Sequence, residues 1–138
     1  MSEKFYLTKK GLEKIKKEYQ DLRRIKLAKT EGENLSFSED KLVELQSILK
    51  NAEMIKLPSK ERQNIINLGA TVVLENSNGK INEFMIVGTL EVNPKEGKIS
   101  SESPVGKALL NHKVYDTVVI TSPTKVVYKI KKIKYQLV

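Results

Sequence analysis

The stretch Leu57-Pro58-Ser59-Lys60 separates two halves of the sequence that have different hydrophobic patterns. Before it, apolar residues recur every three or four positions, which is the period of an amphipathic helix. After it, apolar and polar residues alternate, which is the period of a half-buried strand. Because proline interrupts a helix, the pattern predicts a helical unit at residues 1–56, a linker at 57–67 and a β-rich unit at 68–138.

The first half has the pattern of two helices that pack against each other. Thr8 and Ser38 stand where the N-caps of the two helices would lie. The arms, of roughly 20 and 16 residues, would form an antiparallel coiled-coil hairpin about 25 to 30 Å long, with its loop at residues 31–37. The apolar positions of this seam are Leu12, Ile15, Tyr19 and Leu22 in one arm, and Leu42, Leu45, Ile48, Leu49 and Ala52 in the other.

The second half predicts a small antiparallel sheet with one short helix. Residues 69–75 and 81–87 alternate like strands and are joined by the turn sequence Asn78-Gly79. Ser103-Pro104 is typical of a helix start, with serine as the cap and proline at the first position. The last strands would lie near 118–120 and 126–137, and a change of phase at Lys131-Lys132 indicates a β-bulge. The fold class is therefore α+β.

Composition excludes several kinds of chemistry. The 138 residues include 25 lysines and arginines against 17 acidic residues, and the net charge of +8 favours a polyanionic partner such as nucleic acid or an acidic protein surface. With no cysteine and one histidine, His112, the chain has no disulfide, no thiolate nucleophile and no histidine-rich metal site. No apolar run reaches the ~18 residues of a membrane span and no signal peptide is recognisable, so we expect a cytoplasmic protein without a membrane partner.

Four segments of the chain resemble those of a known family, and the last two, in this order, are not expected by chance. They are Phe5-Tyr6-Leu7-Thr8-Lys9-Lys10-Gly11-Leu12-Glu13-Lys14, then Asn51-Ala52-Glu53-Met54-Ile55, then Ile99-Ser100-Ser101-Glu102-Ser103-Pro104-Val105-Gly106-Lys107-Ala108-Leu109-Leu110, and finally Asp116-Thr117-Val118 followed by Pro123. Together with the helical hairpin they resemble the bacterial Gre transcript-cleavage factors, GreA and GreB. The resemblance covers nearly the whole chain.

The resemblance implies a different role for each of the two units. The C-terminal domain, with an FKBP-like fold, would dock at the rim of the RNA polymerase secondary channel through Glu102, Ser103 and Pro104, although Ser103 and Pro104 would also be needed simply to start a helix. The hairpin would enter the channel, with the 3′ end of the nascent RNA as a further partner. The basic residues that the family associates with that RNA are Lys16, Lys17, Arg23, Arg24 and Lys26, which could equally form a solvated helix face.

The loop of the hairpin departs from the family pattern. A family tip of the form Gly-Asp-Leu-Ser-Glu-Asn, anchored on Leu35-Ser36, places its aspartate at Asn34 and its glutamate at Phe37. Asparagine offers one neutral oxygen and phenylalanine none, whereas two-metal phosphodiester hydrolysis needs hard oxygen ligands. The acids that remain near the tip are Glu31, Glu33, Glu39 and Asp40. Glu33 and Glu39 could replace the family acids only in a different loop conformation, and Glu39 and Asp40 could simply stabilise a helix N-terminus.

The hairpin is also about three heptads shorter than is typical of the family, which would shorten its reach by about 15 Å. We therefore expect a monomeric polymerase-binding elongation factor, not itself an enzyme, with weak or no stimulation of transcript cleavage. It would have no cofactor of its own, and any Mg²⁺ involved would be shared with the polymerase active site. The alternatives are a GreA-like factor that stimulates cleavage through Glu33 and Glu39, a stand-alone RNA-binding protein, and a prolyl isomerase suggested by the FKBP-like fold alone.

Overall fold

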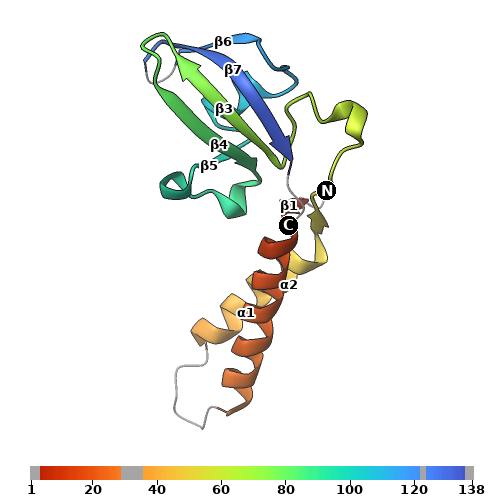
Figure 1. Cartoon of the computed structure of the whole chain (residues 1–138). Helices are drawn as coiled ribbons and strands as arrows, with labels where there is room; N and C mark the ends of the chain where they lie inside the picture. Colours follow the sequence, from red (N-terminus) through yellow and green to blue (C-terminus); the bar gives the residue numbers. More distant parts are fainter. Residues whose placement is uncertain (1–3, 29–35, 122–123, 136–138) are drawn as a thin grey trace. The chain divides into compact units, whose positions relative to one another are not determined.

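The computed structural model describes residues 4–28, 36–121 and 124–135. Contacts between residues divide the chain into two compact units, Met1–Met54 and Ile55–Val138. The first unit is a pair of helices closed by a short β-ribbon, and the second is a curled sheet with a short helix (Figure 1). The division lies just before the Leu57-Pro58-Ser59-Lys60 stretch at which the sequence pattern changes.

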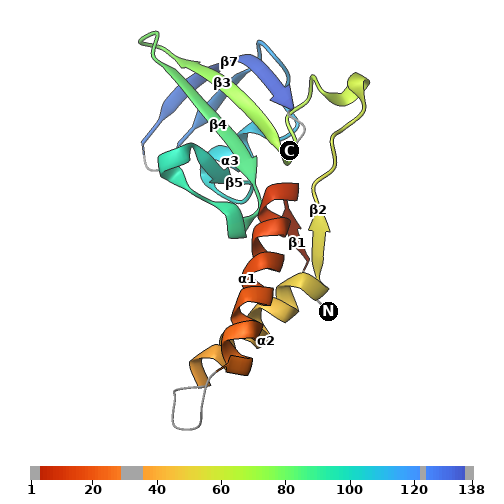
Figure 2. The ribbon, with the colours of Figure 1, turned by 60° about the horizontal axis from the view of Figure 1, so that its bottom comes forward.

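The first unit contains the predicted helical hairpin. Helix α1 spans Lys9–Ala28 and helix α2 spans Ser36–Lys50, and the two run side by side in Figures 1 and 2. The seam is most buried on α2, where three of the predicted positions are buried, while those of α1 are half-buried. The buried residues are Leu42, Leu45 and Ile48.

Among the described residues, no helix has the length and apolar character that crossing a membrane requires.

A local hydrogen bond defines the start of α1, and the bounds of α2 differ from the prediction. The hydroxyl oxygen of Thr8 accepts a hydrogen bond from the amide of Gly11 (3.1 Å), which confirms Thr8 as the N-cap of α1. The predicted cap at Ser38 is wrong, because α2 already begins at Ser36. Ala52, predicted in the helical seam, is also not helical: α2 ends at Lys50, and Ala52 opens a strand.

A two-stranded parallel ribbon, absent from the sequence prediction, closes the base of the hairpin. Strand β1, Phe5–Leu7, pairs with strand β2, Ala52–Met54, in parallel register. The amide of Phe5 also donates to the carbonyl oxygen of Asn51 (3.0 Å). The chain therefore enters α1 and leaves α2 at the same end of the hairpin.

The second unit is a five-stranded sheet in the order β5-β4-β3-β7-β6. Its elements are β3 (Ala70–Asn76), β4 (Ile81–Val87), β5 (Lys98–Ser100), α3 (Pro104–Leu109), β6 (Thr117–Ile120) and β7 (Val126–Tyr135), with single 3₁₀ turns at Lys60–Arg62, Thr89–Glu91 and Pro94–Glu96. The prediction of an antiparallel sheet needs a correction, because β5 pairs with β4 in parallel. The other three pairings are antiparallel.

The turn and the bulge that the sequence predicts are both present. Gly79 has a φ of +81° in the turn between β3 and β4, a left-handed conformation that glycine adopts without strain. In the pairing of β3 with β7 the register shifts between Val73 and Leu74, whose partners are Lys132 and Ile130. Lys131 is therefore the extra residue of a β-bulge.

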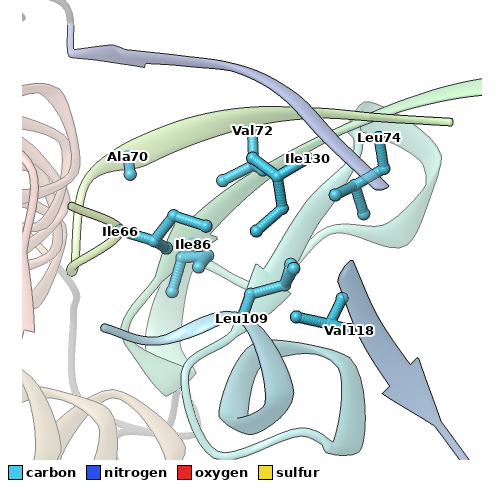
Figure 3. Packing of buried hydrophobic residues seen from close by; sticks show 8 residues of the cluster. All are labelled: Ile66, Ala70, Val72, Leu74, Ile86, Leu109, Val118 and Ile130. Carbon is cyan, nitrogen blue, oxygen red and sulfur yellow. The ribbon is translucent and has the colours of Figure 1, made fainter. Parts of the chain in front are cut away.

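The core of the second unit lies between the sheet and α3. Figure 3 shows side chains from the sheet and Leu109 of α3 pointing toward one another. The cluster comprises Ile66, Ala70, Val72, Leu74, Ile86, Leu109, Val118 and Ile130. Ile66 lies within the predicted linker at 57–67, yet it is fully buried and its backbone bonds to that of Asn111 and His112. The end of that segment is therefore part of the β-rich unit.

Candidate functional site

The start of α3 is held in place by a dense set of hydrogen bonds. The Ser103 hydroxyl oxygen accepts a hydrogen bond from the amide of Gly106 (3.1 Å) and donates one to the carbonyl oxygen of Ser100 (2.7 Å). The amide of Glu102 donates to the Ser100 hydroxyl oxygen (3.0 Å). Pro104 occupies the first helical position, as the sequence predicts. These bonds leave the side chains of Glu102 and Pro104 exposed on either side of a half-buried Ser103.

Gly106 allows α3 to approach the end of β5. A Cβ atom added at Gly106 would lie 2.1 Å from the carbonyl oxygen of Ser100, a distance that no relaxed structure permits. The same Ser100 carbonyl oxygen accepts the hydrogen bond from the Ser103 hydroxyl. The peptide group of Ser100 therefore both binds the capping residue and lies against Gly106. The presentation of Glu102 and Pro104 thus depends on glycine three residues after the cap.

The connection from α3 to β6 is a rigid turn built on residues with left-handed backbone. Asn111 and Tyr115 have φ values of 70° and 74°, a conformation that asparagine adopts more readily than most residues other than glycine. Asp116 Oδ2 accepts a hydrogen bond from the amide of Lys113 (2.9 Å) and lies 3.1 Å from Nδ1 of His112. The bond from Lys113, followed by that from His112, lowers the pKa of the Asp116 carboxyl. His112 is half-exposed, and its contact with Asp116 helps to hold this turn.

The basic residues of α1 lie on its exposed surface. Lys16, Lys17, Arg23 and Arg24 are all exposed. The guanidinium of Arg23 lies 5.9 Å from the ring centroid of Tyr19, and Arg24 lies 3.9 Å from Asp21, an exposed pair that contributes little to stability. Lys26 belongs to the last turn of α1, but its side chain lies outside the described part of the structure.

Most of the predicted tip also lies outside the described residues. This applies to Glu31, Glu33 and Asn34, while Phe37 is in the first turn of α2 with its side chain undescribed. Glu39 and Asp40 are described, and both are exposed in the N-terminal part of α2. Among the residues that the structure describes, no group of three or more histidine, cysteine or acidic side chains could hold a metal ion.

Among the described residues, the aromatic side chains of the second unit lie in different surroundings. Phe84, Tyr128 and Tyr135 pack against the core cluster, whereas Tyr115 is 70% exposed. Two surface hollows, of about 340 and 260 Å³, contain no aromatic side chain. Neither hollow has the converging rings that a proline-binding pocket requires.

Comparisons with known proteins identify the family. The model of the C-terminal domain of the GreA/GreB transcription elongation factors matches residues 61–135. The chain belongs to the GreA/GreB family. It is 32% identical to transcription elongation factor GreA of Thermomicrobium roseum, with 88% of this chain and 90% of that protein covered. It is 36% identical to GreA of Thermotoga sp. strain RQ2, with 89% and 92% covered.

Among solved structures, GreA factor homolog 1 of Thermus thermophilus is similar to this Gre-family chain. The identity is 24%, the TM-score is 0.49, and the match covers 96% of this chain and 99% of that one.

The matches also measure how much shorter this Gre-family chain is than its relatives. The match to the Thermomicrobium roseum protein spans 142 positions, whereas 88% of 138 residues is about 121 residues. The match to the Thermotoga protein spans 145 positions against 89% of the same chain, about 123 residues. About 20 positions within the matched part of each relative therefore have no counterpart in this chain.

Proposed function

We propose that this chain binds RNA polymerase and places its helical hairpin in the secondary channel with weak or no stimulation of transcript cleavage. It acts as an accessory factor rather than as an enzyme. The proposal rests on the tip sequence, in which Asn34 and Phe37 occupy the positions where the resemblance to the Gly-Asp-Leu-Ser-Glu-Asn tip implies acids. Such a factor would compete with full-length Gre factors for the same channel.

The start of α3 supports a docking role for the second unit. Glu102 and Pro104 are exposed, and the hydrogen bonds of Ser103 fix the backbone between them. A surface that is already rigid before binding loses little conformational entropy on association. Glu102 and Pro104 are therefore the side chains that we assign to contact with the polymerase rim, while Ser103 holds them in place.

The residues at the tip do not fit the role of a magnesium ligand set. Asn34 offers a neutral carbonyl oxygen and Phe37 offers no oxygen, whereas Mg²⁺ prefers carboxylates and water. Glu39 and Asp40, the described acids nearest the tip, lie within a regular helix, where acidic side chains stabilise the positive end of the helix dipole. We therefore infer that this chain does not supply the ligands of a catalytic metal ion.

The length of the hairpin points the same way. If the roughly 20 missing positions are shared between the two arms, each arm loses about 10 residues, or about 15 Å of helix. Catalytic geometry tolerates errors near 1 Å, so a tip that stops this far short would not reach the reacting phosphate.

The deciding experiment is transcript cleavage in backtracked elongation complexes of the cognate RNA polymerase. We expect the chain at saturating concentration to leave the cleavage rate near that of polymerase alone, and to suppress stimulation by an authentic GreA added in competition. Glu102→Ala should relieve this suppression, whereas Lys95→Ala, an exposed residue of the 3₁₀ turn at Pro94–Glu96, should not. Strong stimulation by the unmodified chain would overturn the proposal and favour the GreA-like alternative that uses Glu33 and Glu39.

A second variant separates tip chemistry from reach. Asn34→Asp combined with Phe37→Glu restores both family acids without changing the length of the hairpin. If reach is limiting, this double variant stays inactive in cleavage while it still competes with GreA. Recovery of cleavage would show instead that the two side chains alone account for the loss.

A further inference from the structure

The sheet of the second unit has an outer face, opposite the core, on which side chains of β6 and β7 are exposed. On β6 and β7 the core-facing Val118 and Ile130 alternate with residues that point outward. In the register of these two strands Thr117 lies opposite Lys129, and Val119 lies opposite Val127. All four of these outward side chains are exposed, and β6 is the edge strand of the sheet.

The β-bulge raises the density of positive charge on this outer face. Because Lys131 is the inserted residue, Lys131 and Lys132 are both exposed, where a regular strand would turn one of them inward. Lys131 is paired with Glu75 at 3.3 Å. Within the described residues, Lys129 and Lys132 have no carboxylate partner. Lysines on an edge strand prevent it from pairing with other chains, which could explain lysines near β6. This does not explain the two lysines at the bulge, because β7 lies between two strands of the sheet.

A hollow of about 340 Å³ opens on this face between the β3–β4 turn and β7. Five of its lining residues carry hydrogen-bond donors, and the other two are Val127 and Glu75, the acid that pairs with Lys131. The hydroxyls of Ser77 and Thr117 have no hydrogen-bond partner among the described residues, and Asn76 Oδ1 accepts from the amides of Asn78 and Lys80, which leaves its Nδ2 as a donor. Lys129 and Lys131 complete the positive rim. Such a site suits an oxyanion with several acceptor oxygens.

Tyr115 lies next to Lys129, one of the residues that line the hollow. Its ring is 70% exposed, and Lys129 Nζ lies 5.8 Å from the ring centroid. The backbone of Tyr115 is fixed by a hydrogen bond from its amide to the carbonyl oxygen of Ile130 (2.7 Å), in a left-handed conformation that β-branched and bulky residues rarely adopt. An exposed ring on a rigid backbone is a ready surface for stacking a base.

We propose that this outer face binds single-stranded nucleic acid. A phosphate would occupy the hollow between Lys129, Lys131 and the Thr117 hydroxyl, and an adjacent base would stack on Tyr115. Single strands fit better than a duplex because a duplex keeps its bases stacked inside. An acidic protein segment would satisfy the lysines but would leave Tyr115 without a stacking partner. The proposed site belongs to the second unit and does not depend on the role of the hairpin.

The test is binding of a fluorescent 12-residue oligouridylate to the full chain, followed by anisotropy at several salt concentrations. The background carries glutamine at Lys16, Lys17, Arg23 and Arg24, which reduces the contribution of α1 to binding. In this background we compare Tyr115→Asn, which keeps a residue that accepts the left-handed backbone, with Lys129→Gln. The matched control is Lys95→Gln, which removes the same charge from an exposed position in the turn at Pro94–Glu96.

We expect Tyr115→Asn to raise the dissociation constant about fivefold or more. Log affinity falls as log salt rises, and Lys129→Gln should make this dependence less steep by about 0.7, as the loss of one phosphate contact predicts. Lys95→Gln should change neither quantity appreciably. Circular dichroism checks that each variant is folded.

The proposal fails if Tyr115→Asn and Lys129→Gln behave like Lys95→Gln. It fails also if a duplex of the same length binds as tightly as the single strand. Displacement of the oligouridylate by oligoglutamate of equal charge at equal concentration would assign the face to an acidic protein instead.

Discussion

The phenol hydroxyl of Tyr135 donates a hydrogen bond to the carbonyl oxygen of Ile65, which lies 70 residues earlier in the chain. The same hydroxyl oxygen accepts a hydrogen bond from the amide of Asn67 (2.9 Å). One side chain at the end of β7 therefore fixes the segment that leads into β3, next to the buried Ile66. Burial raises the pKa of this phenol.

Tyr135→Phe should lower the free energy of unfolding by about 1 to 2 kcal/mol, because it removes both hydrogen bonds and keeps the ring. The control is Tyr128→Phe, since the hydroxyl of Tyr128 has no hydrogen-bond partner among the described residues. Urea unfolding at neutral pH measures both. Because the pKa of Tyr135 is raised in the folded state, its contribution is present below pH about 10 and is lost as the pH rises through the folded value. Equal stability of the two variants would contradict the role given to Tyr135.

Ser103→Ala and Glu102→Ala should separate stability from docking. Loss of the Ser103 cap is expected to cost about 1 kcal/mol in the free energy of unfolding. Glu102 is exposed, so its substitution should leave the unfolding curve unchanged and weaken binding to RNA polymerase. Chemical unfolding and a direct polymerase-binding assay on both variants provide the comparison. A marked loss of stability in Glu102→Ala would argue that this side chain is structural.

Gly106→Ala should destabilise the second unit by about 3 kcal/mol, because the new methyl group would collide with the carbonyl oxygen of Ser100. Alanine is the better helix former of the two residues, so propensity alone predicts the opposite sign. Lys107→Ala, an exposed neighbour on the same helix, is the control and should be nearly neutral. Thermal unfolding distinguishes the two outcomes directly.

Asp116→Asn should destabilise the turn between α3 and β6 at neutral pH but not at low pH. The pKa of Asp116 is lowered in the folded state, so the carboxylate stabilises the fold above its ordinary value of 3.8, and this contribution is lost as the pH falls through the folded value. The difference in unfolding free energy between the variant and the unmodified chain should therefore shrink from about pH 7 to about pH 2.5. A difference that is constant across this range would show that the charge of Asp116 is not involved.

The sequence predicts those features that are set by residues close together in the chain. The three-and-four spacing from Leu12 to Leu22 predicts α1, Ser103-Pro104 predicts the start of α3, and Lys131-Lys132 predicts the bulge. Each of these depends on a local period or on a hydrogen bond that spans three residues.

The features that sequence reasoning missed depend on partners far away in the chain. Strands β1, β2 and β5 have three residues each, too few to show a period of two, and their partners in the sheets decide whether they form. The residues next to Tyr115 in the sequence likewise do not predict that its ring is exposed, because its position depends on the hydrogen bond to Ile130.

The parallel ribbon of β1 and β2 has a consequence for how this protein family can diverge. With Phe5 beside Ala52 and Leu7 beside Met54, the two ends of the hairpin are tied together independently of what lies between them. Whole helical turns can then be added to or removed from both arms in equal number without shifting the point of attachment. Reach becomes a quantity that evolution can adjust by insertion and deletion alone, while the junction with the rest of the chain stays constant.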